Sequence, residues 1–390
     1  DIAEMRRLTA EAIRAGAMGF SSSRTLNHRS SKGAPTPSLT AEIDEMVGIA
    51  NGLKDAGAGV MEMISDFGDL AAEFNLLEDM VSASGRPMSI SLAQGLSPNG
   101  WRKILDRIDE ASGRGHQMRA QVAPRPIGIL FGLTASLTPF TGRPTFMSLS
   151  GLSVAEKIDR MKDPEVRAKI LSEAVSPGFE GLFKRMDEGR KLWVLGDPPD
   201  YEPAPEVSIA ARAAKAGTDP FALAYDLLLE NDGRTMLYSP FANYADGNLD
   251  CCRDMLLAEN TVPGLGDGGA HVGIISDASF VTTLLAHWGR DRSRGEGIPL
   301  ETLVKRQSQD TARAVALTDR GVLAPGMKAD VNLIDIDNLR VRAPEMVADL
   351  PSGGVRLEQR ADGYLATVVS GEVTYRNGEA TDALPGRLIR

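Results

Sequence analysis

The segment from Gly264 to His271 holds the residues with the clearest chemical potential, because an aspartate stands there between glycines. Asp267 closes the apolar run 262–267, which predicts a buried strand. A carboxylate at the end of a parallel strand lies at the mouth of the sheet, and glycines let a ligand approach the backbone closely. Such a carboxylate can bind a metal and take a proton from water. A turn-forming Asp-Gly pair with no catalytic role is the alternative.

Two arginines follow other predicted strands. Arg24 comes after the run 18–22, with His28 close behind it, and Arg125 follows the run 118–123 between two prolines. At such an edge, a guanidinium group can hold a substrate carboxylate through two parallel hydrogen bonds. The alternatives are a solvated loop arginine at Arg24, a loop hydrogen bond at His28 and a structural turn at Arg125.

Metal ligands are scarce in this chain. It has four histidines and no HxH, HExxH or CxxC pattern, so a metal site built from it alone would be poor in histidine. Glu62 lies inside the apolar run 60–65, where a buried carboxylate needs a partner or a metal. We favour a neighbouring arginine as that partner, with a metal as the alternative.

The composition excludes several classes of protein. The 390 residues carry a net charge of −10, and the 43 basic residues form no run, which argues against a nucleic-acid partner. No apolar run approaches the roughly 20 residues of a membrane helix, so we expect no membrane partner. Cys251 and Cys252 are adjacent in a predicted helix and make a poor disulfide, which favours a reduced cytoplasmic location. A homo-oligomer remains possible.

The elements that must position these residues alternate along the chain. Apolar runs at 18–22, 60–65, 88–93, 118–123 and 262–267 predict buried strands, and amphipathic stretches at 42–53, 70–84 and 101–111 predict helices between them. Strand–helix alternation implies parallel strands joined by crossovers. The sequence therefore predicts an α/β fold.

Two later regions depart from this alternation. Residues 125–260 are rich in proline and charge, which predicts an elaborated loop region with its own helices and with strand candidates at 192–195 and 235–238. After a helix expected at 300–317, the runs 330–335, 365–370 and 372–376 alternate as antiparallel strands do. The dipeptide Asn377-Gly378 then predicts a hairpin turn.

Three passages of the sequence resemble the D-aminoacylase branch of the amidohydrolase superfamily, the N-acyl-D-amino-acid deacylases. They are the stretch 320–335, the ending 384–390, and the glycine-flanked Asp267 with the helix 282–292 that follows it. The likeness is strongest in the last third of the chain and covers nearly all of it.

The resemblance implies a (β/α)8 barrel, N-terminally incomplete in this chain, with the C-terminal part of a small flanking β-sandwich domain. Residues 1–320 would supply barrel strands four to eight and the long insertion, and residues 321–390 the sandwich part. It also implies a divalent metal, with zinc as the first candidate, and hydrolysis of an N-acyl amide bond of an N-acyl-D-amino acid. Asp267 matches the catalytic aspartate of the family, which is both a metal ligand and a general base and acid.

The chain also departs from the family pattern. The HxH of the first strand and the cysteine of the second do not occur, so we expect these elements to precede Asp1 and the chain alone to be inactive. The histidines of the fifth and sixth strands are replaced in the runs 60–66 and 89–94. Glu62 could replace one ligand and Gln94 could face the substrate, although neither matches the family. His28 and His271 are further polar candidates for the substrate site.

These departures leave two alternatives open. The protein could hydrolyse a cyclic amide or another C–N bond, or it could be a non-catalytic barrel that has lost its metal.

Overall fold

A parallel sheet of five strands forms the centre of the molecule, as the strand–helix alternation predicts. The computed structural model describes residues 1–95, 98–266 and 271–389. The strand order is β1-β2-β3-β4-β8, with all pairs parallel. The strands are β1 (Gly19–Arg24), β2 (Val60–Ser65), β3 (Met88–Leu92), β4 (Met118–Val122) and β8 (Thr261–Pro263). The first four match their predicted ranges closely, whereas β8 ends four residues before Asp267.

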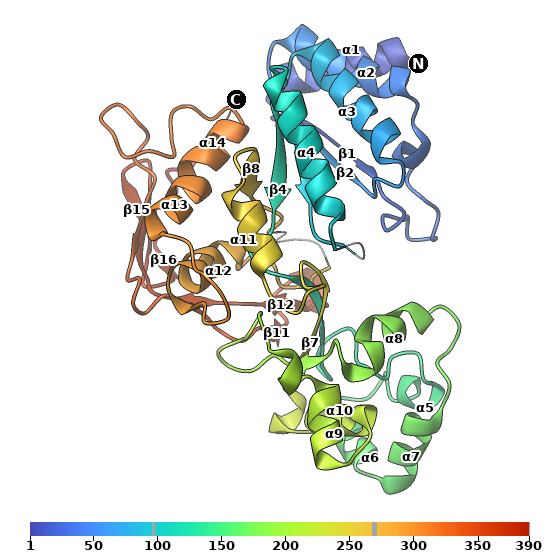
Figure 1. Cartoon of the computed structure of the whole chain (residues 1–390). Helices are drawn as coiled ribbons and strands as arrows, with labels where there is room; N and C mark the ends of the chain where they lie inside the picture. Colours follow the sequence, from blue (N-terminus) through green and yellow to red (C-terminus); the bar gives the residue numbers. More distant parts are fainter. Residues whose placement is uncertain (96–97, 267–270, 390) are drawn as a thin grey trace.

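Helices α1 (Ile2–Ala15), α2 (Ile43–Ala56), α3 (Leu70–Ser84) and α4 (Gly100–Gly113) lie beside these strands (Figure 1). Gly16, Gly57 and Gly85 end the first three in the left-handed conformation, which costs glycine little. Asp69 begins α3, where its side chain accepts a hydrogen bond from the amide of Ala72.

One face of the sheet packs against these helices and the other is polar. Met63, Ile90 and Leu92 are buried in the core that the strands share with α2, α3 and α4. The residues between them, such as Glu62 and Ser89, are only half-buried. Because side chains alternate along a strand, the polar residues share the opposite face of the sheet.

The region between β4 and β8 forms a lobe with its own core, shown in green in Figure 1. Its antiparallel sheet has the order β5-β7-β6, and its helices run from α5 to α10. The bounds are β5 (Ile127–Phe131), α5 (Pro144–Met147), α6 (Val154–Met161), α7 (Pro164–Ser172), α8 (Glu180–Met186), β6 (Trp193–Val194), α9 (Ile209–Ala216), α10 (Pro220–Leu228) and β7 (Leu237–Ala242). We call residues 123–249 the insertion lobe. Its helices confirm the prediction that this region has helices of its own. The strand expected at 235–238 corresponds to β7, which begins and ends a few residues later.

The chain returns from the insertion lobe through α11 (Asp250–Leu257) to β8 and then forms α12 (Phe280–Ala286), α13 (Leu300–Lys305) and α14 (Thr311–Ala314). Five-residue π-helical segments, His287–Asp291 and Arg306–Asp310, follow α12 and α13. Short 3-10 turns lie at Pro37–Thr40, Asp187–Gly189, Pro205–Val207, Asn231–Gly233 and Pro351–Gly353. Cys251 and Cys252 are buried and not in a disulfide, as expected.

The C-terminal part is antiparallel, which confirms the change of pattern predicted there. A four-stranded sheet has the order β16-β15-β14-β9, and two ribbons pair β10 with β13 and β11 with β12. The bounds are β9 (Val331–Ile334), β10 (Arg340–Val341), β11 (Glu345–Val347), β12 (Arg356–Glu358), β13 (Ala361–Asp362), β14 (Tyr364–Val369), β15 (Glu372–Arg376) and β16 (Glu379–Ala380). Asn377 and Gly378 both have positive φ, as the predicted hairpin turn requires.

The chain is therefore a mixed α/β protein with a parallel and an antiparallel part. The closed barrel, its incompleteness, the sandwich and the domain border at residue 320 stay predictions. Of the helices in the described ranges, none is both long and apolar enough to cross a membrane.

Candidate functional site

The carboxyl edge of the parallel sheet is where the sequence places most of the candidate residues. Arg24 is the last residue of β1, Gln94 comes shortly after β3, and Arg125 comes shortly after β4. Parallel strands end at a common edge, so these residues lie at or after strand ends on the same side of the sheet. Asp267 lies outside the described residues. The structure therefore describes the strand ends and the residues that precede and follow Asp267 in the sequence.

Arg24 is held by protein groups on several sides. Its Nη2 lies 2.8 Å from Oε1 of Glu73, its Nε donates to the same carboxylate, and its Nη1 donates to the carbonyls of Ser38 and Ala41. Hydrogen bonding from Arg24 lowers the pKa of Glu73, although burial of the carboxylate opposes this. The guanidinium thus joins the end of β1 to α3. A substrate carboxylate could use it only by replacing some of these partners, and that role stays a prediction.

His28 lies in the exposed loop after β1, where its Nδ1 is 2.6 Å from the hydroxyl oxygen of Ser23. Asp66, which directly follows β2, shapes the same loop. It accepts hydrogen bonds from the hydroxyl of Thr25 at 2.5 Å and from the amide of Leu26 at 2.8 Å. The sequence analysis did not select Asp66, although its place after a strand is the signal that singled out Arg24.

Gln94 is buried and joins the end of β3 to the insertion lobe. Its backbone amide donates to Oδ1 of Asn243, and its carbonyl accepts from the amide of Asn243. Its side-chain amide donates to Oδ2 of Asp246 at 2.7 Å and accepts from the amide of Ala245 at 2.9 Å. These contacts use the side chain within the protein, so a direct contact of Gln94 with a substrate stays a prediction.

Arg125 is also buried, with 1% of its surface exposed. Its guanidinium carbon lies 3.6 Å from the ring centre of Tyr201 and 4.8 Å from that of Phe280. Nη2 donates to the carbonyl of Ser276 at 2.5 Å, and Nη1 donates to the hydroxyl of Thr283 at 3.2 Å. The residue therefore binds the segment that follows Asp267 in the sequence.

Glu62 faces an amide, not an arginine, so the arginine partner favoured from the sequence is wrong. Gln121 Nε2 donates to Oε1 of Glu62 at 2.9 Å and to the hydroxyl of Ser89 at 2.8 Å. The strand register aligns Ser21, Glu62, Ser89 and Arg119 in one row across β1 to β4. The polar face of the sheet thus carries a row of polar side chains that ends in Arg119, and two members of the row accept hydrogen bonds from Gln121.

His271 is exposed and has a φ of 53°, a left-handed conformation that few non-glycine residues adopt. Its carbonyl accepts hydrogen bonds from the amides of Ile274 and Ile275. The segment after it is fixed by neighbours, because the amide of Leu130 donates to the carbonyl of Ile274 and the amide of Leu357 donates to that of Val272. A substrate role for His271 stays a prediction.

The described residues do not form a metal site by themselves. Within residues 1–95, 98–266 and 271–389, no group of three or more His, Cys, Asp or Glu side chains is placed to hold a metal ion. Glu62 belongs to no such group within these ranges, and its carboxylate accepts a hydrogen bond from Gln121. A metal would therefore need donors from outside the described ranges, and Asp267 is one such residue.

Glu202 was missed by the sequence analysis, although it is the centre of a buried charge network. Its carboxylate accepts hydrogen bonds from the Nε and Nη2 groups of Arg292 and from the amide of Leu249, and it lies 3.2 Å from Nε2 of His287. Burial alone would raise the pKa of Glu202, but the hydrogen bonds from His287 and Arg292 outweigh it and lower the pKa to about 2. His287 therefore has a carboxylate partner. No local sequence pattern marks Glu202, because its partners lie far along the chain.

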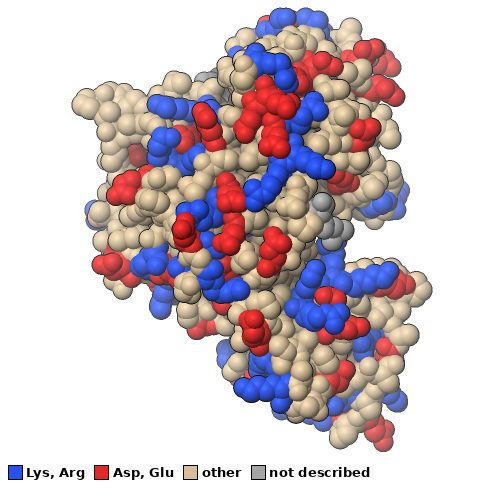
Figure 2. Space-filling view, in the orientation of Figure 1, with Lys and Arg blue, Asp and Glu red and all other residues tan. Residues whose placement is uncertain are grey.

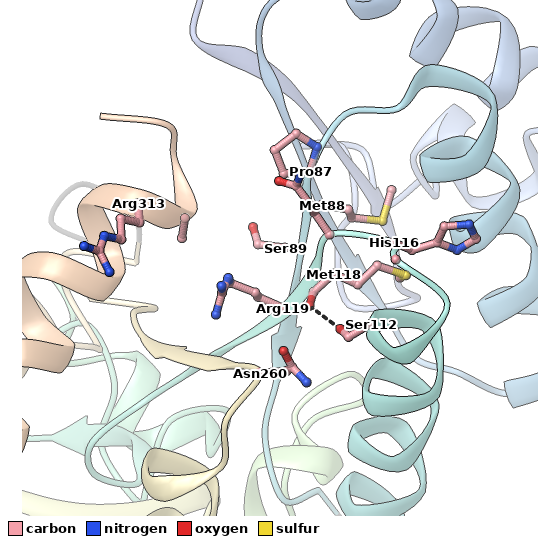
Figure 3. Close-up of a pocket in the computed structure, with 12 residues that line it drawn as sticks. Pro87, Met88, Ser89, Ser112, His116, Met118, Arg119, Asn260 and Arg313 are labelled. Carbon is pink, nitrogen blue, oxygen red and sulfur yellow. Dashed lines mark hydrogen bonds between the residues drawn. The ribbon is translucent and has the colours of Figure 1, made fainter. Parts of the chain in front are cut away.

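A cavity of about 270 Å³ lies at the opposite edge of the sheet, where β3 and β4 begin (Figure 3). Pro87, His116 and Asn260 line it, and the side chain of Arg119 extends into it. None of the candidate residues from the sequence lines this cavity. It is therefore distinct from the predicted site.

The surface carries both signs of charge. On the face shown in Figure 2, acidic and basic side chains are interspersed, and an indentation separates the insertion lobe from the rest of the molecule. No single-sign field dominates this face.

The chain belongs to the amidohydrolase family, whose model matches residues 1–375. Two solved structures of D-aminoacylase resemble it with TM-scores of 0.55 and 0.54 at 19% and 18% identity, over 98% of this chain. One is described for the role of its binuclear metal centre, the other as defining a novel subset of amidohydrolases. This chain spans 64% of the length of each. No curated protein matches the sequence significantly.

Proposed function

We propose that this protein is a metal-dependent amidohydrolase that cleaves an N-acyl amide bond, with an N-acyl-D-amino acid as the preferred substrate. The family match over residues 1–375 carries the proposal. The parallel sheet supports it, because Arg24, Gln94 and Arg125 follow three strands at one edge and Asp267 follows β8 in the sequence. Active sites of barrel enzymes lie at that edge.

In this proposal, Asp267 accepts a proton from the attacking water and then delivers it to the leaving nitrogen. The glycines beside Asp267 would let the substrate amide come close to the backbone. The metal is a divalent ion, with zinc first among the candidates. Because the described residues hold no three-donor cluster, its ligands would include donors outside them.

The test compares two aspartate variants of the protein, each loaded with zinc. Asp267→Asn removes the proposed proton acceptor and is expected to lower kcat by roughly a hundredfold or more. Asp159→Asn is the matched control, since Asp159 is an exposed residue of α6 in the insertion lobe. Release of the free amino acid from N-acetyl-D-amino acids reports turnover. Full activity in Asp267→Asn would contradict the assignment.

A substrate panel separates the two enzymatic possibilities. N-acyl-D-amino acids, their L-enantiomers and hydantoin rings are compared by kcat/KM at equal metal content. Preference for the ring would replace the acyl-amide proposal by the cyclic-amide alternative. If the protein binds no metal, and added zinc restores no turnover on any substrate, the non-catalytic scaffold is the remaining assignment.

A further inference from the structure

Arg125 stands where a substrate-binding arginine was predicted, yet its contacts point to a different use. Both of its hydrogen bonds, together with the ring of Phe280, lie in the segment 276–283. Nη2 also lies 3.8 Å from Oδ1 of Asp277. Its hydrogen bonds therefore attach the guanidinium to one stretch of chain, the one that follows Asp267 in the sequence and enters α12.

The residues just before Asp267 are attached close to Arg125. The amide of Gly264 donates to the carbonyl of Val122, the last residue of β4, at 2.9 Å. The chain is thus attached at the end of β4 by Gly264, and to Arg125, shortly after β4, by Ser276 and Thr283. Asp267 lies between these two attachment points in the sequence.

The cage around Arg125 excludes water from the guanidinium. The ring of Tyr201, from the insertion lobe, lies over it at 3.6 Å, and the hydroxyl of Tyr201 accepts a hydrogen bond from Nε2 of Gln359. Gln359 in turn accepts from the hydroxyl of Ser279. A buried cation over aromatic rings is held more firmly than one in water. Residues from the insertion lobe and the C-terminal part therefore fix the position of Arg125.

We propose that Arg125 is a positioning residue that fixes the segment 276–283, which follows Asp267 in the sequence, at the carboxyl edge of the sheet, and does not bind the substrate. The contacts of Arg125 carry the structural part of this proposal, whereas its consequence for catalysis rests on the proposed function. Lysine could not replace it fully, because one ammonium group lacks the planar fork that reaches Ser276 and Thr283 together.

Hydrogen–deuterium exchange tests the structural part. In Arg125→Met, the amides of Ile274, Ile275 and Phe280 are expected to exchange roughly tenfold faster, because the segment loses its attachment. Arg143→Met is the control: Arg143 is also a buried guanidinium near aromatic rings, but it donates to the carbonyls of Ile170 and Leu171 inside the insertion lobe. Its loss should raise exchange in the insertion lobe and leave residues 271–284 unchanged.

A milder variant keeps the test informative should Arg125→Met fail to fold. Thr283→Val removes the acceptor of the Nη1 hydrogen bond, together with the hydroxyl's own bond to the carbonyl of Ser279, and should raise exchange between residues 276 and 284 alone. Unchanged exchange at 271–284 in a folded Arg125→Met or Thr283→Val protein would overturn the proposal. So would a rise of equal size throughout the chain, since that reports general loss of stability.

Steady-state kinetics test the consequence for catalysis. Misplacing a catalytic group lowers kcat, whereas losing a substrate ligand raises KM. We expect Arg125→Lys to lower kcat roughly tenfold with little change in KM. A rise in KM at unchanged kcat would restore the carboxylate-binding role. If the wild-type protein hydrolyses nothing, the proposed function fails while the exchange result still decides the positioning role.

Discussion

Arg24 and Arg125 lie at the same carboxyl edge of the sheet, at the end of β1 and shortly after β4, and both were predicted to bind a substrate carboxylate, but the structure surrounds them differently. Arg24 has a carboxylate partner, Glu73, and both side chains keep some exposure to solvent. Arg125 has a carbonyl, a hydroxyl and two rings as its near partners, and Asp277 lies at 3.8 Å. The comparison teaches that the position of an arginine after a strand in the sequence predicts that it lies at the sheet edge. Whether it can bind a substrate depends on the protein groups that already surround it.

The largest effect is expected from Arg125→Met. The substitution leaves the carbonyl of Ser276 and the hydroxyl of Thr283 without their donor in a buried place, where each lost partner is costly. We expect the free energy of unfolding to fall by about 3 kcal/mol. Urea denaturation followed by tryptophan fluorescence measures it. A loss no larger than that of Arg24→Met would remove the distinction between the two arginines.

Glu202→Gln extends the comparison to a fully buried carboxylate–guanidinium pair. The folded pKa of Glu202 is about 2 and its ordinary value is 4.5, so its stabilising effect is complete above 4.5 and is lost as the pH falls toward 2. We expect the variant to lose about 2–3 kcal/mol at neutral pH and to approach the wild type in acid. If the difference in the free energy of unfolding between wild type and variant stayed constant from pH 7 to pH 3, the charged pair of Glu202 and Arg292 would not be what stabilises this site.

Arg24→Met should have a smaller effect. Glu73 keeps a hydrogen bond from the hydroxyl of Ser65 and partial contact with water, so we expect a loss of about 1–2 kcal/mol at neutral pH. Because Arg24 lowers the pKa of Glu73, this difference should shrink as the pH falls below the ordinary pKa of a glutamate and through the lowered one. Urea titrations of wild type and variant at several pH values would show it. If the loss of stability were independent of pH, the hydrogen bonds from Arg24 to the carbonyls of Ser38 and Ala41 would contribute more to stability than the pair with Glu73.

Glu62→Gln should have the smallest effect, about 0.5 kcal/mol or less, because a glutamine oxygen can still accept the hydrogen bond from Gln121. The same variant sharpens the question of the metal. Mass-spectrometric metal content equal to that of the wild type would show that Glu62 is not a ligand, whereas a clear loss would make it one.

The sequence predicted the parts of this fold that depend on local pattern. The strands from β1 to β4 and the helices between them were predicted from apolar runs and helical periodicities, which are set by residues close together in the sequence. The turn at Asn377-Gly378 was predicted from those two residues alone. The end of β8 was placed too late, because the glycines after Pro263 continue the apolar run without continuing the pairing.

The site was less predictable because its contacts are distant in sequence. Arg24 and Glu73 are 49 positions apart, and Gln121 and Glu62 are 59 apart. The partners of Arg125 lie still further away, in the insertion lobe and in α12. Their position at strand ends was enough to select the arginines as candidates. Whether the partner of each candidate is a carboxylate, an amide or an aromatic ring depends on tertiary packing, which the local sequence does not specify.

Gln94 gives the insertion lobe an attachment of a particular kind. Its backbone bonds to Asn243 and its bond from the amide of Ala245 join amides that do not ionise, whereas its bond to Asp246 and the Glu202 network each use a carboxylate. Strong acid should therefore weaken the Glu202 network while the bonds of Gln94 to Asn243 and Ala245 remain. At low pH these amide bonds would still join the insertion lobe to the end of β3.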